Sequence, residues 1–220
     1  GNTGDGELIW NSSINITDRR VSQTPVLKLR KGELDPRPGS IMRDQGGPDF
    51  YGYIWTDSDE TGGPVFNWFD ISSVGTSPGD ADDENYGAFP LGFDFSFYGN
   101  AFSTVRLGTN GFLSFTSTAT TYANTQIGDS DEPNNLIAPF FDALSPNQTG
   151  DLYYYADNDN NRFIVQWSDV SHYISGGGSN NPETFQVIIN ADGSIIFQYY
   201  TISDASSCTV GLESSNGTGL

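Results

Sequence analysis

Most of the chain consists of short runs of aromatic and β-branched residues, separated by turn residues. The run Phe93–Tyr98 alternates between apolar and polar positions, as a half-buried strand does. An Asn110-Gly111 pair between two such runs predicts a hairpin. No segment has an apolar stripe at helical spacing. Further strands are predicted at residues 50–55, 65–71, 104–107, 111–115, 136–141, 152–155, 163–167, 184–189, 194–200 and 208–212.

Strands at this spacing predict an all-β fold, a two-sheet antiparallel β-sandwich of jelly-roll-like form. The 30 aromatic residues (11 Tyr, 15 Phe and 4 Trp) among 220 supply apolar surface for a sizeable core. Residues 46–220 are expected to form the sandwich domain. Residues 1–45 look different and are expected to be an extended basic arm or edge strands, with short apolar runs at 8–10 and 26–29.

The net charge of the chain also changes sign near residue 45. Seven of the nine Lys and Arg residues lie in the first 43 positions, which also hold five acids, a net charge of 7 − 5 = +2. The remainder has 2 − 23 = −21. This acidic balance argues against nucleic-acid binding, which needs a basic face. The arm either lies on an acidic surface, its own or a neighbour's, or is simply solvated. No apolar stretch is long enough to span a membrane.

Signatures of catalysis are weak, and no catalytic or cofactor-binding residue is assigned. His172 is the only histidine, and it lacks a nucleophile-elbow motif. A thiol dyad of His172 with the single cysteine, Cys208, is conceivable, but a buried strand residue is the preferred interpretation of Cys208. The chain is therefore predicted not to be an enzyme.

Metal binding is the best chemical hypothesis, because Ca²⁺ prefers carboxylate, amide and carbonyl oxygens. Acidic loops at 57–60, 80–85, 129–132 and 157–161 have suitable side chains, although each could equally be a solvated turn. Like charges held this close repel one another, and a divalent ion relieves that repulsion. The predicted calcium ligands are Asp57, Asp59, Glu60, Asp80, Asp82, Asp83, Asp157 and Asp159.

Two features concern carbohydrate. Four sequons make Asn11, Asn15, Asn147 and Asn216 candidate glycosylation sites of an exported glycoprotein. Adjacent tyrosines at 153–155 and 199–200 place rings on both faces of a strand, so one set either packs under another layer or forms a platform for a glycan.

The order of these motifs resembles a known family. The run Gly92–Phe115, followed by Ile137–Asp142, Phe163–Trp167 and Asp192–Tyr200, is similar to nidogen-like and plexin-domain-containing extracellular modules. Residues 53–71 resemble the form found in secreted bacterial proteins, often beside subtilisin-like peptidases. The resemblance covers about residues 38–220 and implies a β-sandwich, an extracellular or cell-surface location and no catalysis. It also favours loops 57–60 and 80–85 as the acidic stretches that bind metal.

The leading functional hypothesis is a structural or adhesive module, stabilised by Ca²⁺, that binds protein partners or copies of itself through strand or arm exchange. The alternative is an accessory or carbohydrate-binding domain of a larger secreted hydrolase.

Overall fold

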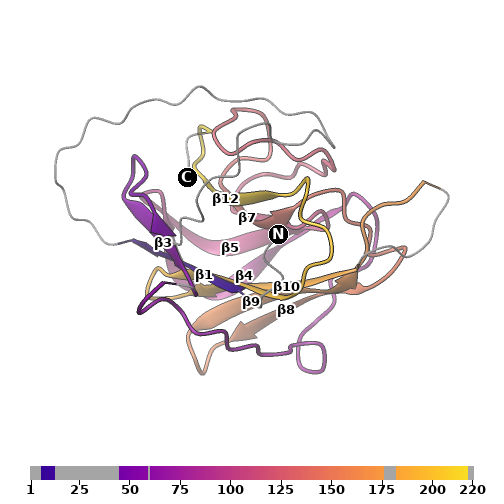
Figure 1. Ribbon diagram of the computed structural model, residues 1–220, viewed down its shortest axis with the longest axis horizontal. Helices are drawn as coiled ribbons and strands as arrows, with labels where there is room; N and C mark the ends of the chain where they lie inside the picture. Colours follow the sequence, from indigo (N-terminus) through magenta and orange to yellow (C-terminus); the bar gives the residue numbers. More distant parts are fainter. Residues whose placement is uncertain (1–5, 13–44, 59, 176–181, 218–220) are drawn as a thin grey trace.

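The chain folds as two antiparallel β-sheets that face each other across one interior (Figure 1). The computed structural model describes residues 6–12, 45–58, 60–175 and 182–217. Every regular element within these ranges is a strand. The strands are β1 (Gly6–Ser12), β2 (Gln45–Gly46), β3 (Tyr53–Asp57), β4 (Asn85–Phe97), β5 (Asn100–Gly108), β6 (Phe112–Ser114), β7 (Leu136–Phe141), β8 (Asp151–Asp157), β9 (Arg162–Val170), β10 (Glu183–Asn190), β11 (Ile195–Thr201) and β12 (Thr209–Glu213).

The larger sheet has the order β2-β3-β1-β11-β10-β9-β8, and the smaller has the order β12-β7-β6-β5-β4. Strands β8 to β11 are antiparallel neighbours in chain order, as are β4 to β7. The predicted all-β, two-sheet antiparallel sandwich is therefore confirmed.

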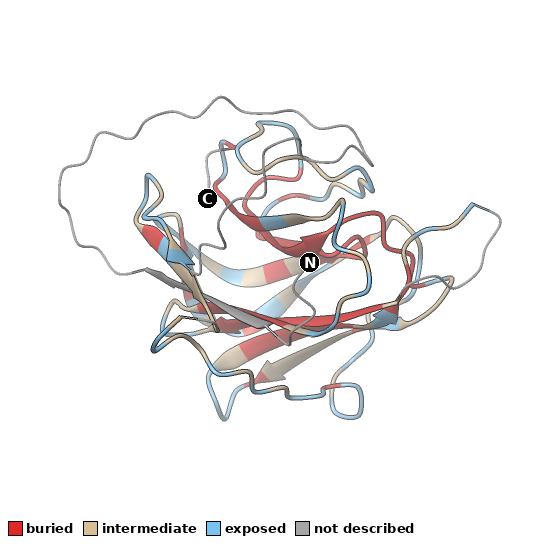
Figure 2. Cartoon of the chain, in the orientation of Figure 1, coloured by how far each residue is buried: buried red, intermediate tan, exposed pale blue. Residues whose placement is uncertain are grey.

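Alternation along the strands builds the core. Every second residue of β9 and β10 faces the smaller sheet and belongs to the main buried apolar cluster. Figure 2 shows that buried segments lie along both layers of the sandwich. The indole ring of Trp167 stacks on Phe185 with ring centroids 4.8 Å apart, and its Nε1 donates a hydrogen bond to the Thr109 carbonyl oxygen at 3.2 Å. The polar atom of the largest buried side chain is thus satisfied across the interior.

The predicted hairpin at Asn110-Gly111 is confirmed, because β5 pairs with β6 across it with Gly108 opposite Phe112. Gly111 has φ of +79°, a left-handed conformation that glycine adopts without steric cost.

The predicted strand at residues 65–71 is wrong. This segment runs over the outer face of the larger sheet, and glutamine side chains of the sheet, rather than a neighbouring strand, bind its backbone. Gln166 accepts a hydrogen bond from the Ile71 N–H at 3.0 Å, and Gln186 donates to the Phe69 carbonyl at 2.6 Å. Gln198 of β11 accepts from the Asn67 N–H at 3.0 Å. The aromatic residues of segment 65–71 correctly indicate burial against a sheet. They do not indicate that the segment pairs as a strand.

The segment at residues 65–71 covers part of the outer face, where some of the adjacent tyrosines of 153–155 and 199–200 lie. On the outer face, Tyr153 and Tyr155 pack against a small cluster that includes Ile71. On the inner face, the Tyr199 hydroxyl donates to the Pro139 carbonyl at 2.7 Å. Tyr200 is 56% exposed, which leaves it as the most open of the tyrosines considered as a glycan platform.

The N-terminal segment contributes a strand inside the larger sheet. The backbone of β1 pairs with β3 on one side and with β11 on the other (Figure 1). This piece is therefore an inner strand, whereas an extended arm or edge strands were expected here. Residues 13–44 lie outside the described residues, so the boundary between residues 45 and 46 stays a prediction.

Candidate functional site

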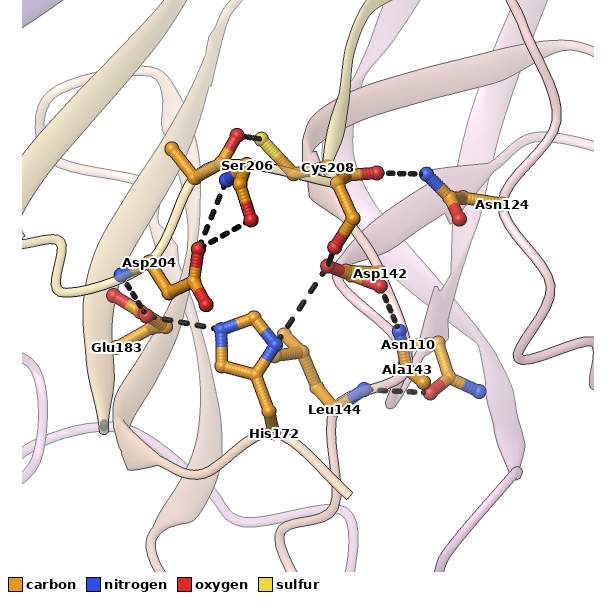
Figure 3. Close-up of polar contacts among 12 residues, drawn as sticks. Asn110, Asn124, Asp142, Ala143, Leu144, His172, Glu183, Asp204, Ser206 and Cys208 are labelled. Atoms are coloured by element: carbon orange, nitrogen blue, oxygen red, sulfur yellow. Dashed lines mark hydrogen bonds and ion pairs between the residues drawn. The ribbon is translucent and has the colours of Figure 1, made fainter. Parts of the chain in front are cut away.

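One buried polar cluster joins the ends of the two sheets. Asp142 follows β7 directly, His172 follows β9, Glu183 is the first residue of β10, and Asp204 lies between β11 and β12. These four residues are called the His172 cluster below. Figure 3 shows the imidazole ring between the carboxylates of Asp142 and Glu183.

The contacts in this cluster are short and numerous. His172 Nε2 lies 3.0 Å from Glu183 Oε1, and His172 Nδ1 lies 3.6 Å from Asp142 Oδ2. Glu183 also accepts hydrogen bonds from the Ser203 N–H at 2.8 Å, the Ser203 hydroxyl at 2.9 Å and the Asp204 N–H at 3.0 Å. Asp142 accepts from the Ser207 hydroxyl at 2.5 Å and from the backbone N–H of Ala143 at 2.8 Å. Each buried carboxylate is thus held by several donors.

The electrostatics favour a charged imidazole. Burial alone lowers the pKa of His172, but the hydrogen bond with Glu183 and the negative charges of Asp142, Glu183 and Asp204 raise that pKa above its ordinary value. A protonated ring is a donor at both nitrogens, which matches two flanking carboxylates. The cluster is therefore an ion-pair network that ties the loops at one end of the sandwich together.

Nucleophilic catalysis finds little support in this geometry. Burial, followed by the charge of Asp142, raises the pKa of the Cys208 thiol to about 12, so the reactive thiolate is disfavoured. Cys208 is half-buried and directly precedes β12, so it is not the buried strand residue expected. The nearby Ser207 hydroxyl donates to Asp142 rather than to His172, whereas a triad needs a hydroxyl held by the imidazole base.

The calcium ligands predicted in the first loop are only partly described. Asp57 ends β3, and Glu60 lies in the turn that follows, where its N–H donates to the Asp57 carbonyl at 3.4 Å. Asp59 lies outside the described residues. Asp57 and Glu60 thus share one turn.

The second loop brings two of its acids against distant segments. Asp83 Oδ1 accepts a hydrogen bond from the Asn110 amide at 2.9 Å. Asp82 Oδ1 is buried and has no hydrogen-bond partner among the described residues. Burial, followed by the charge of Asp83, raises the pKa of Asp82, and the Ser145 hydroxyl partly offsets this rise. Asp80 is exposed. Asp82 and Asp83 thus lie side by side in this loop, and their role as calcium ligands stays a prediction.

In the loop at residues 157–161, the acid Asp157 is paired within the fold. Asp157 is only 4% exposed, and its carboxylate accepts from the Arg162 guanidinium at 2.8 Å and from the Asn160 amide at 2.9 Å. Burial raises the pKa of Asp157, but Arg162 and Asn160 together hold it below its ordinary value. Asp157 therefore closes the β8–β9 hairpin, while Asp159 stays exposed at its tip.

In the described ranges, no group of three His, Cys, Asp or Glu side chains is arranged to hold a metal ion. Calcium can also take amide and carbonyl oxygens, so the calcium site stays a prediction.

Two of the four candidate glycosylation sites are exposed in the described residues. Asn147 and Asn216 are exposed, and their side-chain oxygens accept hydrogen bonds from Ser145 at 2.6 Å and Ser214 at 2.5 Å. Asn11 lies in β1, and Asn15 is outside the described residues. Their modification stays a prediction.

Sequence reasoning found His172 but missed its partners. Asp142 and Glu183 carry no motif that distinguishes them from the other acids, and only the pairing of β9 with β10 and the bridge between Leu144 and His172 bring them together.

Fold and site together define an all-β sandwich module whose buried polar groups hold loops in place. The NIDO related family model matches residues 60–220, and the chain belongs to this family. This family is not known as one of enzymes. No solved structure matches the chain. The described residues also contain no helix with the length and apolarity that crossing a bilayer requires.

Proposed function

We propose that the chain is a non-catalytic extracellular module with a structural or adhesive role, which acts by assembling with other proteins or with copies of itself. The assembly step is the exchange of β1 between neighbouring molecules. Membership of the NIDO related family supports an extracellular setting, as do the exposed sequon residues Asn147 and Asn216.

The position of β1 is the observation that carries this proposal. Leu8 is in register with Asp57 of β3 and with Phe197 of β11, so β1 pairs along both of its edges. A sheet without β1 would leave unpaired N–H and C=O groups on β3 and β11, which invite another strand. The slot between β3 and β11 accepts a strand of this sequence, whichever copy supplies it.

The chain length between β1 and β2 permits exchange. Residues 13–44 separate the two strands, and a segment of this length reaches roughly 100 Å when fully extended. The charge division also favours contact between copies, because the first 43 residues carry 7 − 5 = +2 and the rest 2 − 23 = −21.

The test compares the full chain with the variant Ile9→Pro. A proline in an inner strand removes a ladder hydrogen bond. We expect light scattering to show that the full chain forms dimers or larger species as concentration rises, and that I9P stays monomeric with a lower melting temperature. Asn2→Pro, which precedes β1, is the control and should assemble normally. A full chain that stays monomeric at every concentration would refute the exchange of β1.

Calcium stabilisation is part of the same proposal, and the buried unpaired oxygen of Asp82 beside Asp83 supports it. Asp82→Asn should reduce the rise in melting temperature that Ca²⁺ produces if this loop binds the ion. An unchanged calcium response would remove this loop from the proposal.

A second candidate, an accessory or carbohydrate-binding domain of a larger secreted hydrolase, draws on one surface. The rings of Trp68 and Tyr200 have centroids 5.2 Å apart, and Phe66 stacks on Trp68 at 6.2 Å. Neighbouring aromatic rings suit the apolar faces of sugar rings. A glycan array probed in the presence of Ca²⁺ should show binding that Trp68→Ala abolishes, and an array without signal counts against this role.

A further inference from the structure

A second buried polar region surrounds Glu213, the last residue of β12. Glu213 Oε2 accepts a hydrogen bond from the Gly128 N–H at 2.7 Å, and the Asn135 N–H donates to the Ser214 carbonyl at 3.1 Å. These bonds hold residues 126–135 against the end of β12. Residues 126–135 together with Glu213 are called the Glu213 loop below.

Glu213 is a buried carboxylate, and no cation balances it among the described residues. It is only 1% exposed, and no ion pair joins it to a Lys or Arg in the described part of the chain. A buried ionised carboxylate is costly unless its oxygens are paired. Here Oε1 finds no hydrogen-bond partner among the described residues. This arrangement leaves one carboxylate oxygen free to bind a ligand.

The same loop contains further unpaired oxygens. Gln126 Oε1, Asn134 Oδ1 and Asn135 Oδ1 are buried and lack hydrogen-bond partners within the described ranges. The amide orientation of the two asparagines is fixed, because Asn134 Nδ2 donates to the Ser130 carbonyl at 3.2 Å and Asn135 Nδ2 donates to Thr116 Oγ1 at 2.8 Å. Rotating either amide to satisfy its oxygen would break that bond. Unsatisfied buried oxygens are rare in folded proteins and are completed by a bound water or ion, so several in one loop mark a place for such a ligand.

The charges around Glu213 also favour a bound cation. Burial, followed by repulsion from Asp129 and Glu132, raises the pKa of Glu213 to about 7. A bound cation would lower the electrostatic cost of the ionised form at neutral pH.

We propose that the Glu213 loop binds Ca²⁺, with the Glu213 carboxylate and the amide oxygens of Gln126 and Asn134 as its side-chain ligands. Oxygen-only ligands select a hard cation, and amide oxygens with few carboxylates suit Ca²⁺ better than Mg²⁺. Backbone carbonyls and water complete its coordination. Among the described residues, Asp129 and Glu132 do not join Glu213 in a group able to hold a metal ion, so Glu213 is the one carboxylate among the proposed ligands. The dissociation constant should accordingly lie in the range of about 10⁻⁴–10⁻³ M that is typical of extracellular modules.

The Glu213 loop contains the acidic run predicted at residues 129–132, but the proposed ligands Gln126, Asn134 and Glu213 lie outside that run. The proposal does not depend on the exchange of β1. The ligands come from a polar loop and a strand end about 80 residues apart, so no short motif marks the site.

The test is a calcium titration of the full chain at about pH 8. Calorimetry measures the binding, and the melting temperature measures the stabilisation. Glu213→Gln keeps the size of the side chain and removes its charge. We expect wild type to bind Ca²⁺ and to melt at a higher temperature in its presence, and E213Q to bind at least about tenfold more weakly. Mg²⁺ should produce a much smaller shift. Binding should also weaken below pH 7, where Glu213 takes up a proton.

Two matched controls make the result decisive. Asp151→Asn removes an exposed carboxylate from β8 and should leave calcium binding unchanged. Asp82→Asn tests the loop at residues 80–85 and should leave the Glu213 site intact. The melting temperature without Ca²⁺ shows that E213Q folds. A wild-type chain that takes up no Ca²⁺, an E213Q variant that responds like wild type, or a response abolished by D82N alone would overturn the proposal.

Discussion

The His172 cluster and the Glu213 loop each bury a glutamate, but they satisfy it in opposite ways. Glu183 accepts four hydrogen bonds, from His172, from the N–H and hydroxyl of Ser203 and from the N–H of Asp204. Glu213 accepts one from Gly128, keeps an unpaired oxygen and faces two further acids. The first carboxylate is completed by the protein itself, whereas the second is not.

This difference separates a structural role from a binding role. A buried charge that the fold fully pairs holds chain segments together and leaves nothing for a ligand. A buried charge with an unpaired oxygen lowers stability until something binds to it. The same substitution, glutamate to glutamine, should therefore have opposite effects at the two sites.

The largest effect is expected for Glu183→Gln. An amide can accept some of the same hydrogen bonds, but its NH₂ group faces an N–H donor in either orientation, that of Ser203 at the Oε2 position or that of Asp204 at the Oε1 position. The ion pair with His172 is also lost. We expect the free energy of unfolding to fall by about 2–3 kcal/mol. Urea denaturation measures this, with Asp151→Asn as an exposed control that should change it by less than about 0.5 kcal/mol. A loss for E183Q as small as that of the control would show that the cluster is not the structural element described.

A smaller, pH-dependent effect is expected for His172→Gln. The folded-state pKa of His172 is raised above its value of 6.5, so its contribution is fully present below that pH and is lost as the pH rises through the folded pKa. The groups that face the ring are Asp142, Glu183 and Asp204. We expect wild type to exceed H172Q by about 1–2 kcal/mol at about pH 5.5 and by less at about pH 9.

Urea denaturation of both proteins across this range gives the difference directly. Other titrating groups cancel, because they occur in both chains. A difference that stays constant with pH would contradict the assignment of a protonated imidazole, and would reduce His172 to a neutral packing residue.

The two clusters also show what could be predicted from the sequence. The period-2 pattern of apolar residues identified most strands, because sheet burial repeats every second residue. It failed at residues 65–71, where side chains of Gln166, Gln186 and Gln198 replace strand pairing. It also gave no sign that β1 would be an inner strand, since strand order is set by contacts between distant segments.

The candidate sites were harder to predict for a related reason. Runs of acids at 57–60, 80–85, 129–132 and 157–161 are visible in the sequence, but Asp157 proves to be paired with Arg162. Glu213 is an ordinary strand residue in the sequence and gains its chemistry only from the loop folded against it. Burial and missing partners, rather than local charge density, distinguish a binding carboxylate from a structural one.

The smallest effect is expected for Glu213→Gln in the presence of a chelator. This variant tests the contrast between Glu183 and Glu213 most directly. The pKa of Glu213 rises from 4.5 in the unfolded chain to about 7 in the folded one, so its contribution to stability is fully present below about pH 4.5 and is lost as the pH rises through about 7. Above that pH, wild type has to bury a charge that the amide lacks. We expect E213Q to be more stable than wild type by about 1 kcal/mol at about pH 8, and the two to be equal near pH 4. Urea denaturation at both pH values measures this difference. Destabilisation of E213Q at pH 8 without metal would mean that the Glu213 carboxylate is already satisfied by the fold, and the contrast with Glu183 would disappear.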